Sequence, residues 1–184
     1  MTLAALGRNP SQARETNGVS PGARDAPMYD MIELMFFAYR DFVADADKML
    51  AALGFGRAHH RVLHFVARRP GLTIAELLDI LKITKQSLSR VLKELLERGY
   101  VEARPGAKDR RQRQLFPTRR GEALALDAAL LQTERFERVF AGLPHEARPQ
   151  ALAFLLSMVD PGGQDKAAAM TGAAGAMSAE GLSW

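Results

Sequence analysis

The stretch of sequence that decides the fold reads ITKQSLSRVLKELLERGYVEARPGAKDRRQRQLFPT and occupies residues 83–118. Its first half has apolar residues three and four apart, which predicts a helix with one buried face. Thr84 can cap the start of this helix, and Gly99 ends it as C-terminal glycines commonly do. Alternating residues at 100–104 and 112–116 then predict two strands joined by a polar loop. The buried face of the helix is expected to hold Leu88, Val91, Leu92, Leu95 and Leu96.

Two further helices are predicted before this stretch. A helix over residues 57–69 ends before Pro70 and Gly71, which stop it. Thr73, with Glu76 three residues later, forms a capping box that starts a short helix reaching about Leu81. This short helix and the helix after Thr84 are joined near residues 82–84. The two therefore have the arrangement of a helix-turn-helix.

Positive charge is concentrated in and around this stretch. The whole chain carries a net charge of +4, but residues 84–120 hold eleven basic and four acidic residues, a net charge of +7, which leaves −3 on the remainder. Such a local excess suits a polyanion that binds one surface of the protein.

The outer face of the helix after Thr84 is polar and basic. A helix of this kind fits the major groove of duplex DNA, where residues near its N-terminus meet base edges. Gln86 can bond adenine bidentately and Arg90 can do the same to guanine, while Ser87 and Ser89 can reach bases or phosphate. The free amides of the first turn also favour a phosphate. The candidate DNA-binding residues of this helix are Thr84, Lys85, Gln86, Ser87, Ser89, Arg90 and Lys93.

The predicted hairpin loop carries three more candidates, Arg110, Arg111 and Arg113. Arginine on a protruding loop suits the narrow and strongly negative minor groove of DNA. Asp109 lies inside this basic cluster, so we expect it to pair with a neighbouring arginine and to order the loop. The remaining guanidinium would then be aimed at the DNA. The alternative is a solvated charge run on a surface hairpin.

A long helix is predicted near the start of the chain. Apolar residues three and four apart follow one side of it for more than seven turns. One domain rarely needs so long a seam, so we expect a partner chain to pack on it. An ordinary core helix in a large bundle is the alternative. The seam consists of Met28, Ile32, Met35, Tyr39, Phe42, Ala46, Met49 and Leu53.

Several classes of protein are excluded by the composition. Cysteine is absent, so disulfides and thiolate chemistry are excluded, and a cytoplasmic location is expected. Charges interrupt every apolar run before it reaches membrane-spanning length, so no membrane contact is expected. The sequence has neither a phosphate-cradling glycine loop nor paired carboxylates, so we expect no enzyme activity and no cofactor. His59, His60 and His64 lie close together, but without a complementary carboxylate we expect no metal site.

The chain is expected to form one folded unit with loose ends. Residues 1–26 are rich in Gly, Pro, Ser, Asn and Ala, which predicts a disordered leader. We expect an N-terminal dimerisation helix at 27–56, a winged helix-turn-helix domain at 57–117 and C-terminal dimerisation helices at 118–160, begun by a cap at Thr118. Five glycines predict that residues 161–184 form a flexible tail.

These segments resemble the winged helix-turn-helix signature of the MarR family of bacterial transcription regulators, and a looser similarity extends over about residues 28–160. The resemblance implies a mainly α fold with a small β-wing, in which the winged helix-turn-helix is set within an α-helical homodimer. It also implies that Asp109 braces the wing and that Arg111 enters the minor groove. This chain departs from the family at Pro117, which cannot donate a ladder hydrogen bond, so the returning strand is expected to end by Phe116. The resemblance is carried by Ser87-Leu88-Ser89-Arg90, residues 95–104, Asp109-Arg110-Arg111 and Pro117-Thr118-Arg119-Arg120-Gly121.

Many members of that family respond to small phenolic or other aromatic ligands held between the dimer helices and the DNA-binding lobe. The resemblance therefore predicts a dimeric repressor, either constitutive or released by such an effector, that binds double-stranded DNA at a pseudo-palindromic operator. A winged-helix module that binds another protein is the competing hypothesis. Plain core packing is the alternative role for the aromatic pocket candidates. The pocket candidates are Phe36, Phe37, Tyr39, Arg40, His60 and His64.

Overall fold

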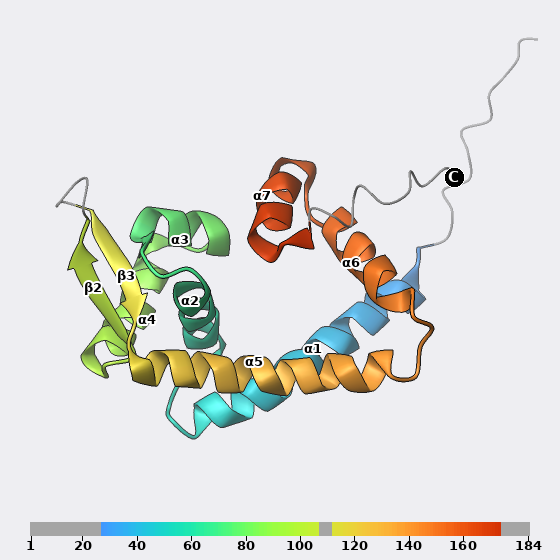
Figure 1. Ribbon diagram of the computed structural model, residues 1–184, viewed down its shortest axis with the longest axis horizontal. Helices are drawn as coiled ribbons and strands as arrows, with labels where there is room; N and C mark the ends of the chain where they lie inside the picture. The colour runs from blue at the N-terminus through green and yellow to red at the C-terminus, as the bar shows by residue number, and fades with distance from the viewer. Residues whose placement is uncertain (1–26, 107–111, 174–184) are drawn as a thin grey trace, which may run out of the picture.

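The computed structural model describes residues 27–106 and 112–173. The elements, in chain order, are α1 (Tyr29–Ala51), α2 (Arg57–Arg68), β1 (Leu72–Thr73), α3 (Ile74–Leu81), α4 (Lys85–Glu97), β2 (Val101–Pro105), β3 (Arg113–Pro117), α5 (Arg119–Phe140), α6 (Ala147–Ser157) and α7 (Pro161–Thr171). Figure 1 shows α5 as a long rod crossed by α1, with α2, α3, α4 and the strands at one end and α6 at the other. The prediction of a mainly α fold with a small β-wing is confirmed. None of the described helices has the length and apolar character needed to cross a membrane.

Threonine side chains cap the starts of three helices, as the sequence predicts. Thr73 Oγ1 accepts a hydrogen bond from the Glu76 amide at 3.2 Å, and Glu76 Oε2 accepts one from the Thr73 amide at 2.8 Å, which completes the capping box of α3. Thr84 Oγ1 accepts from the Ser87 amide at 3.2 Å at the start of α4. Thr118 has the same role at the start of α5. Each bond satisfies an amide that the helix itself leaves unpaired.

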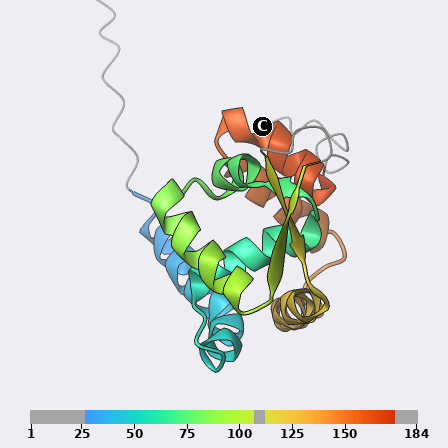
Figure 2. The ribbon, with the colours of Figure 1, turned by 90° about the vertical axis from the view of Figure 1, so that its left-hand side faces the viewer.

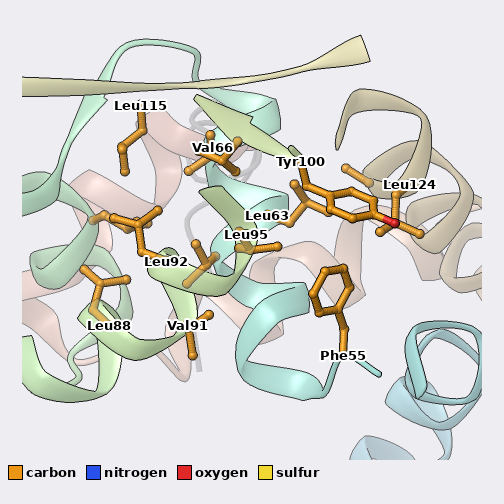
Figure 3. Close-up of a cluster of buried hydrophobic side chains, with 14 of the residues drawn as sticks. Phe55, Leu63, Val66, Leu88, Val91, Leu92, Leu95, Tyr100, Leu115 and Leu124 are labelled. Atoms are coloured by element: carbon orange, nitrogen blue, oxygen red, sulfur yellow. The ribbon is translucent and has the colours of Figure 1, made fainter. Parts of the chain in front are cut away.

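The helix-turn-helix lobe has its own hydrophobic core. In Figure 3 the side chains of α4 point toward those of α2, and Leu115 of β3 lies on the far side of the cluster. Each fully buried leucine or valine stabilises the fold by roughly 1.5 to 3 kcal/mol. The core therefore fixes how α4 is turned and which of its faces meets solvent. As predicted, its inner face buries Leu88, Val91, Leu92 and Leu95, while Leu96 is half-buried.

The three strands form one antiparallel sheet in the order β1-β3-β2. Val101 pairs with Pro117 and Pro105 with Arg113, so both prolines stand at strand ends. The expectation that the returning strand ends by Phe116 is therefore wrong by one residue. The ladder continues beyond Pro117 through a bond from the Thr118 amide to the Tyr100 carbonyl at 3.1 Å, so the missing proline N–H leaves no gap. The short strand β1, paired with the middle of β3, was not predicted.

Helix α1 divides into two halves with different surroundings. Its C-terminal half buries Val43, Ala46 and Leu50, and Asp45 pairs with Arg135 of α5 at 3.0 Å. The buried stripe is thus offset from the predicted seam, and the helix ends at Ala51 rather than Leu53. Its N-terminal half is largely exposed to solvent in the described chain. Its large apolar side chains are between 39% and 69% exposed: Met28, Tyr29, Met31, Ile32, Leu34, Met35, Phe36, Phe37 and Tyr39.

A helix stands where the sequence predicts a flexible tail. Residues 161–171 form α7, because Pro161 occupies the first helical position, where its missing N–H costs nothing. Gly172 ends the helix with φ +75°, and the alanine-rich interior favours helix despite the flanking glycines. Lys166 hydrogen-bonds to Asp79 of α3 and, together with Lys82, lowers the pKa of that carboxyl to about 2. Residues 174–184, like the predicted leader at 1–26, lie outside the described residues.

Candidate nucleic-acid interface

The turn between α3 and α4 is held without a glycine. Lys82 ends α3 in the left-handed conformation with φ 50° and ψ 45°. Its amide donates to the Leu78 carbonyl at 2.9 Å, and its ammonium pairs with Asp79 at 2.6 Å. Two local bonds thus stabilise a conformation that a residue with a side chain rarely adopts. The turn fixes the angle at which α4 leaves α3.

The polar face of α4 is open to solvent. Figure 2 shows α4 and the β2–β3 hairpin together on the face of the molecule that forms the left-hand side of Figure 1. The structure brings the α4 candidates together on one exposed surface, opposite the buried face of the helix. This surface consists of Thr84, Lys85, Gln86, Ser87, Ser89, Arg90 and Lys93.

The hairpin extends beside this helix. Pro105 pairs with Arg113, and the Gly106 amide donates to the Gln112 carbonyl at 2.8 Å, so the two strands stay joined as far as residue 112. Arg113 is exposed. The other wing candidates, Asp109, Arg110 and Arg111, lie outside the described residues.

The guanidinium groups of three arginines in the basic segment lie over aromatic rings. The guanidinium carbon of Arg98 lies 4.1 Å from the ring centre of Phe55, that of Arg120 lies 4.3 Å from Tyr100, and that of Arg104 lies 4.5 Å from Phe116. Cation–π contacts of this kind hold the guanidinium in place. In the structure the guanidinium groups of these three lie over the protein's own aromatic rings, although the side chains stay exposed.

A histidine joins α2 to α4, a contact that sequence reasoning missed. His59 Nδ1 accepts a hydrogen bond from the Gly56 amide at 3.1 Å, so the ring proton lies on Nε2, which donates to Glu94 Oε2 at 2.9 Å. The ring also stacks on Phe55, with 4.8 Å between centroids. Both ring nitrogens are thus occupied in fixing α4 against the first turn of α2. Residues 59 and 94 are too far apart in sequence for spacing to predict the pair.

The residues predicted to line an effector pocket lie in two different environments. His60 is buried and His64 half-buried, with ring centroids 6.5 Å apart, and burial is the main cause that lowers the pKa of each imidazole. Both are therefore neutral at pH 7. Tyr39 lies on the exposed part of α1 beneath the Arg57 guanidinium at 5.6 Å, and Arg40 pairs with Asp41 at 2.7 Å. The pocket stays a prediction, as do the roles of Phe36 and Phe37.

Two hollows are found at other places in the described chain. One, of about 550 Å³, lies between the C-terminal half of α5 and α6, and its apolar lining comes from Phe136, Phe140, Leu152 and Leu155. The other, of about 190 Å³, lies beside α4 and includes Arg61 of α2. Within residues 27–106 and 112–173, no group of three histidines or carboxylates could hold a metal ion.

Comparison with known proteins places the chain among helix-turn-helix regulators. The model of the MarR family matches residues 53–112, from the end of α1 to the wing. The HTH-type transcriptional regulator PetP of Rhodobacter capsulatus is 45% identical over 134 residues, which cover 71% of this chain and 78% of PetP. A MarR transcriptional regulator from Methanosarcina mazei Go1 is 26% identical, with a TM-score of 0.60 over 71% of this chain and 94% of its own.

Other solved structures share the fold at lower identity. Streptococcus pneumoniae FabT, solved in complex with DNA, has a TM-score of 0.64 at 16% identity, over 72% of this chain and 94% of FabT. The winged helix-turn-helix seen here is thus that of a large group of solved regulators, and the identity to PetP is well above the level that shows a fold alone. The chain belongs to the MarR family.

Proposed function

We propose that this protein is a DNA-binding transcription regulator that acts as a homodimer on a pseudo-palindromic operator. The observation that carries this proposal is the exposed polar face of α4, which stands beside an arginine-bearing hairpin on one side of the molecule. The relatives support it, because PetP is named a transcriptional regulator and FabT was solved in complex with DNA. We assign no catalytic role to any residue.

Helix α4 is the recognition helix of this proposal. Its N-terminal turn enters the major groove, where Gln86 bonds a base edge and Ser87 and Ser89 meet bases or backbone. Lys85 and Lys93 add phosphate contacts, which carry affinity rather than sequence preference. The cap at Thr84 keeps the first amides of the helix oriented toward the DNA.

The wing contacts the adjoining minor groove. Arg111, supported by Arg110 and Arg113, inserts its guanidinium there, and Asp109 braces the loop. The family resemblance implies these roles, and the pairing of β2 with β3 as far as Pro105 and Arg113 supports a hairpin at this place.

Dimerisation is supported by two apolar surfaces that the single chain leaves uncovered. The N-terminal half of α1 exposes nine large apolar side chains, and the groove between α5 and α6 is lined by four more. Monomeric proteins rarely expose apolar surfaces of this extent. A second copy whose α1 lies against this groove would cover both surfaces and would set the distance between the two α4 helices.

The regulator is a repressor in this proposal, and a small aromatic or phenolic effector bound near His60, His64 and Tyr39 releases it from DNA. A protein-binding winged helix is disfavoured by where the apolar residues lie. Within the described part of the chain, every large apolar side chain that is exposed belongs to residues 28–39 or 126–158, outside the helix-turn-helix. A protein-docking surface would need such groups on the lobe itself.

Replacing Gln86 with alanine is expected to remove base preference at one position of each half-site. The wild-type protein should enrich an inverted repeat from a library of randomised duplexes, because two symmetric helices read two half-sites. Loss of a bidentate glutamine contact costs about 1 to 3 kcal/mol at the base it reads. The measurement is sequencing of the enriched pools.

Lys93→Ala is the matched control on the same helix. It should weaken binding to all duplexes alike, because a phosphate contact carries no base preference. An enriched motif that is the same for Gln86→Ala as for the wild type would show that Gln86 is not a reader. Absence of any enriched duplex with the wild type would contradict the proposed function itself.

A further inference from the structure

The hollow beside α4 brings two arginines from different helices to one place. Arg61 of α2 and Arg90 of α4 both line it, together with Ser87 of the first turn of α4. Apolar side chains of α2, the end of α3, the turn and α4 form the remaining lining. Its volume of about 190 Å³ is several times the roughly 30 Å³ that one water molecule occupies in the liquid. The hollow therefore has room for a hydrated polyatomic anion.

The charges around this hollow are not balanced by the described chain. Among residues 27–106 and 112–173, neither Arg61 nor Arg90 forms an ion pair with a carboxylate. The ammonium of Lys82, in the turn between α3 and α4, is paired with Asp79. Both side chains are exposed, so water and salt screen their mutual repulsion, but an anion between Arg61 and Arg90 would be attracted by both charges. The hollow therefore favours binding of an anion from outside the chain.

Hydrogen-bond donors remain free to bind that anion. Arg61 Nη2 donates to the Leu81 carbonyl at 3.0 Å, which anchors the side chain and uses one of its five N–H donors. Ser87 Oγ accepts a bond from the Thr84 hydroxyl at 2.9 Å, so its own hydrogen can be donated. The start of α4 adds the positive end of the helix dipole. Two guanidinium groups and a hydroxyl match the oxygens of a phosphate.

We infer that this hollow seats one phosphodiester group of the DNA backbone, held by Arg61 and Arg90. The inference rests on the proposed function and extends the DNA contact to α2, outside the helix-turn-helix. It also changes the predicted role of Arg90 from a base contact to a backbone contact, and leaves base reading to Gln86. Backbone contacts fix the position of a protein on the duplex. This phosphate contact therefore sets how deeply, and in which register, α4 lies in the major groove.

The variants Arg61→Ala and Arg90→Ala test this phosphate contact. Their affinity is measured for a duplex that the wild type selects. Each variant is expected to lose about tenfold in affinity, the loss typical of a charge-assisted hydrogen bond, and to lose it equally for every duplex. The slope of log affinity against log salt should become shallower by about 0.9 for each lost phosphate, or about 1.8 for a dimer. Arg68→Ala, an equal loss of charge on the same helix away from the hollow, should bind as the wild type does.

A methylphosphonate scan of the same duplex separates a direct contact from a structural effect. One neutral linkage should weaken the wild type about as much as Arg61→Ala does, and should not weaken Arg61→Ala further. Arg61→Lys, which keeps the charge, should retain the wild-type salt slope with an intermediate affinity. Thermal unfolding of each variant checks its fold, and Arg61→Lys carries the test if the alanine variant does not fold.

Three results would overturn the inference. The first is an Arg61→Ala variant that binds the duplex as tightly as the wild type does. The others are methylphosphonates that weaken DNA binding by Arg61→Ala as much as by the wild type at every position, and a changed base preference in Arg90→Ala. A further contradicting result would be that inorganic phosphate raises the unfolding temperature of the wild type but not of Arg61→Ala, while both proteins bind DNA equally. The hollow would then bind a free anion and not the DNA backbone. A wild type that binds no duplex would instead contradict the proposed function.

Discussion

Replacing Gly121 with alanine is expected to destabilise the protein by about 3 kcal/mol or more, one of the larger effects a single methyl group can have. A Cβ at this position would lie 1.9 Å from the Tyr100 carbonyl oxygen and 3.0 Å from its carbon. The obstacle is backbone, so no side-chain rotation relieves it. The same oxygen accepts the bond from the Thr118 amide, which joins α5 to the sheet. Gly121 therefore permits the close approach on which the seating of α5 against the helix-turn-helix lobe depends.

The expected loss is measured as the change in midpoint of thermal unfolding, which should fall by roughly 10 °C for a chain of this size. Gly162→Ala is the matched control, because a Cβ there meets no atom within 4 Å. This control should be neutral or slightly stabilising, since alanine reduces the freedom of the unfolded chain. An unfolding midpoint for Gly121→Ala within a degree or two of the wild type would show that α5 does not pack as closely as described.

Replacing Leu155 with glutamate is expected to convert the protein into a monomer and to lower operator affinity by about two orders of magnitude or more. Leu155 lines the groove between α5 and α6 and is 48% exposed in the single chain. The fold of one chain should therefore tolerate the change. Covering the groove with a second copy would bury an unpaired carboxylate, which costs about 3 to 5 kcal/mol. Without the dimer, each half-site contact is made alone.

Light scattering at micromolar concentration measures the mass, and fluorescence anisotropy measures the affinity. Gln150→Glu adds the same charge at an exposed position of α6 that does not line the groove. It should remain a dimer with wild-type affinity. A dimeric mass for Leu155→Glu would contradict the assignment of this groove to the dimer interface.

Local sequence patterns were sufficient to predict the helix-turn-helix. The caps at Thr73, Thr84 and Thr118 and the stop at Gly99 act within a few residues of themselves, so their spacing alone fixes where the helices begin and end. The helical spacing of apolar residues predicted the buried face of α4 for the same reason. The polar residues on the opposite face were therefore the candidates for DNA binding.

Features that depend on distant parts of the chain were missed or displaced. The two-residue strand β1 is too short to carry a pattern of its own and exists through pairing with Leu115 and Gln114. Helix α7 was not predicted, because the glycines of residues 161–184 favour a flexible tail over the helix that the alanines favour. The pairs His59 with Glu94 and Arg61 with the Leu81 carbonyl join α2 to later elements, so neither follows from spacing. Arg104 over Phe116 is a cross-strand neighbour that an exact hairpin register would have predicted.

The most direct test of the account is an equilibrium titration of the wild-type protein with its selected duplex at a series of salt concentrations. The expected result is two chains bound per duplex, with affinity falling by about 10³ to 10⁵ between 50 and 200 mM salt, as for proteins that contact six to ten phosphates. A scrambled duplex should bind far more weakly at each salt concentration. Binding that does not change with salt or with sequence, or that saturates at one chain per duplex, would contradict a dimeric regulator that reads DNA through α4.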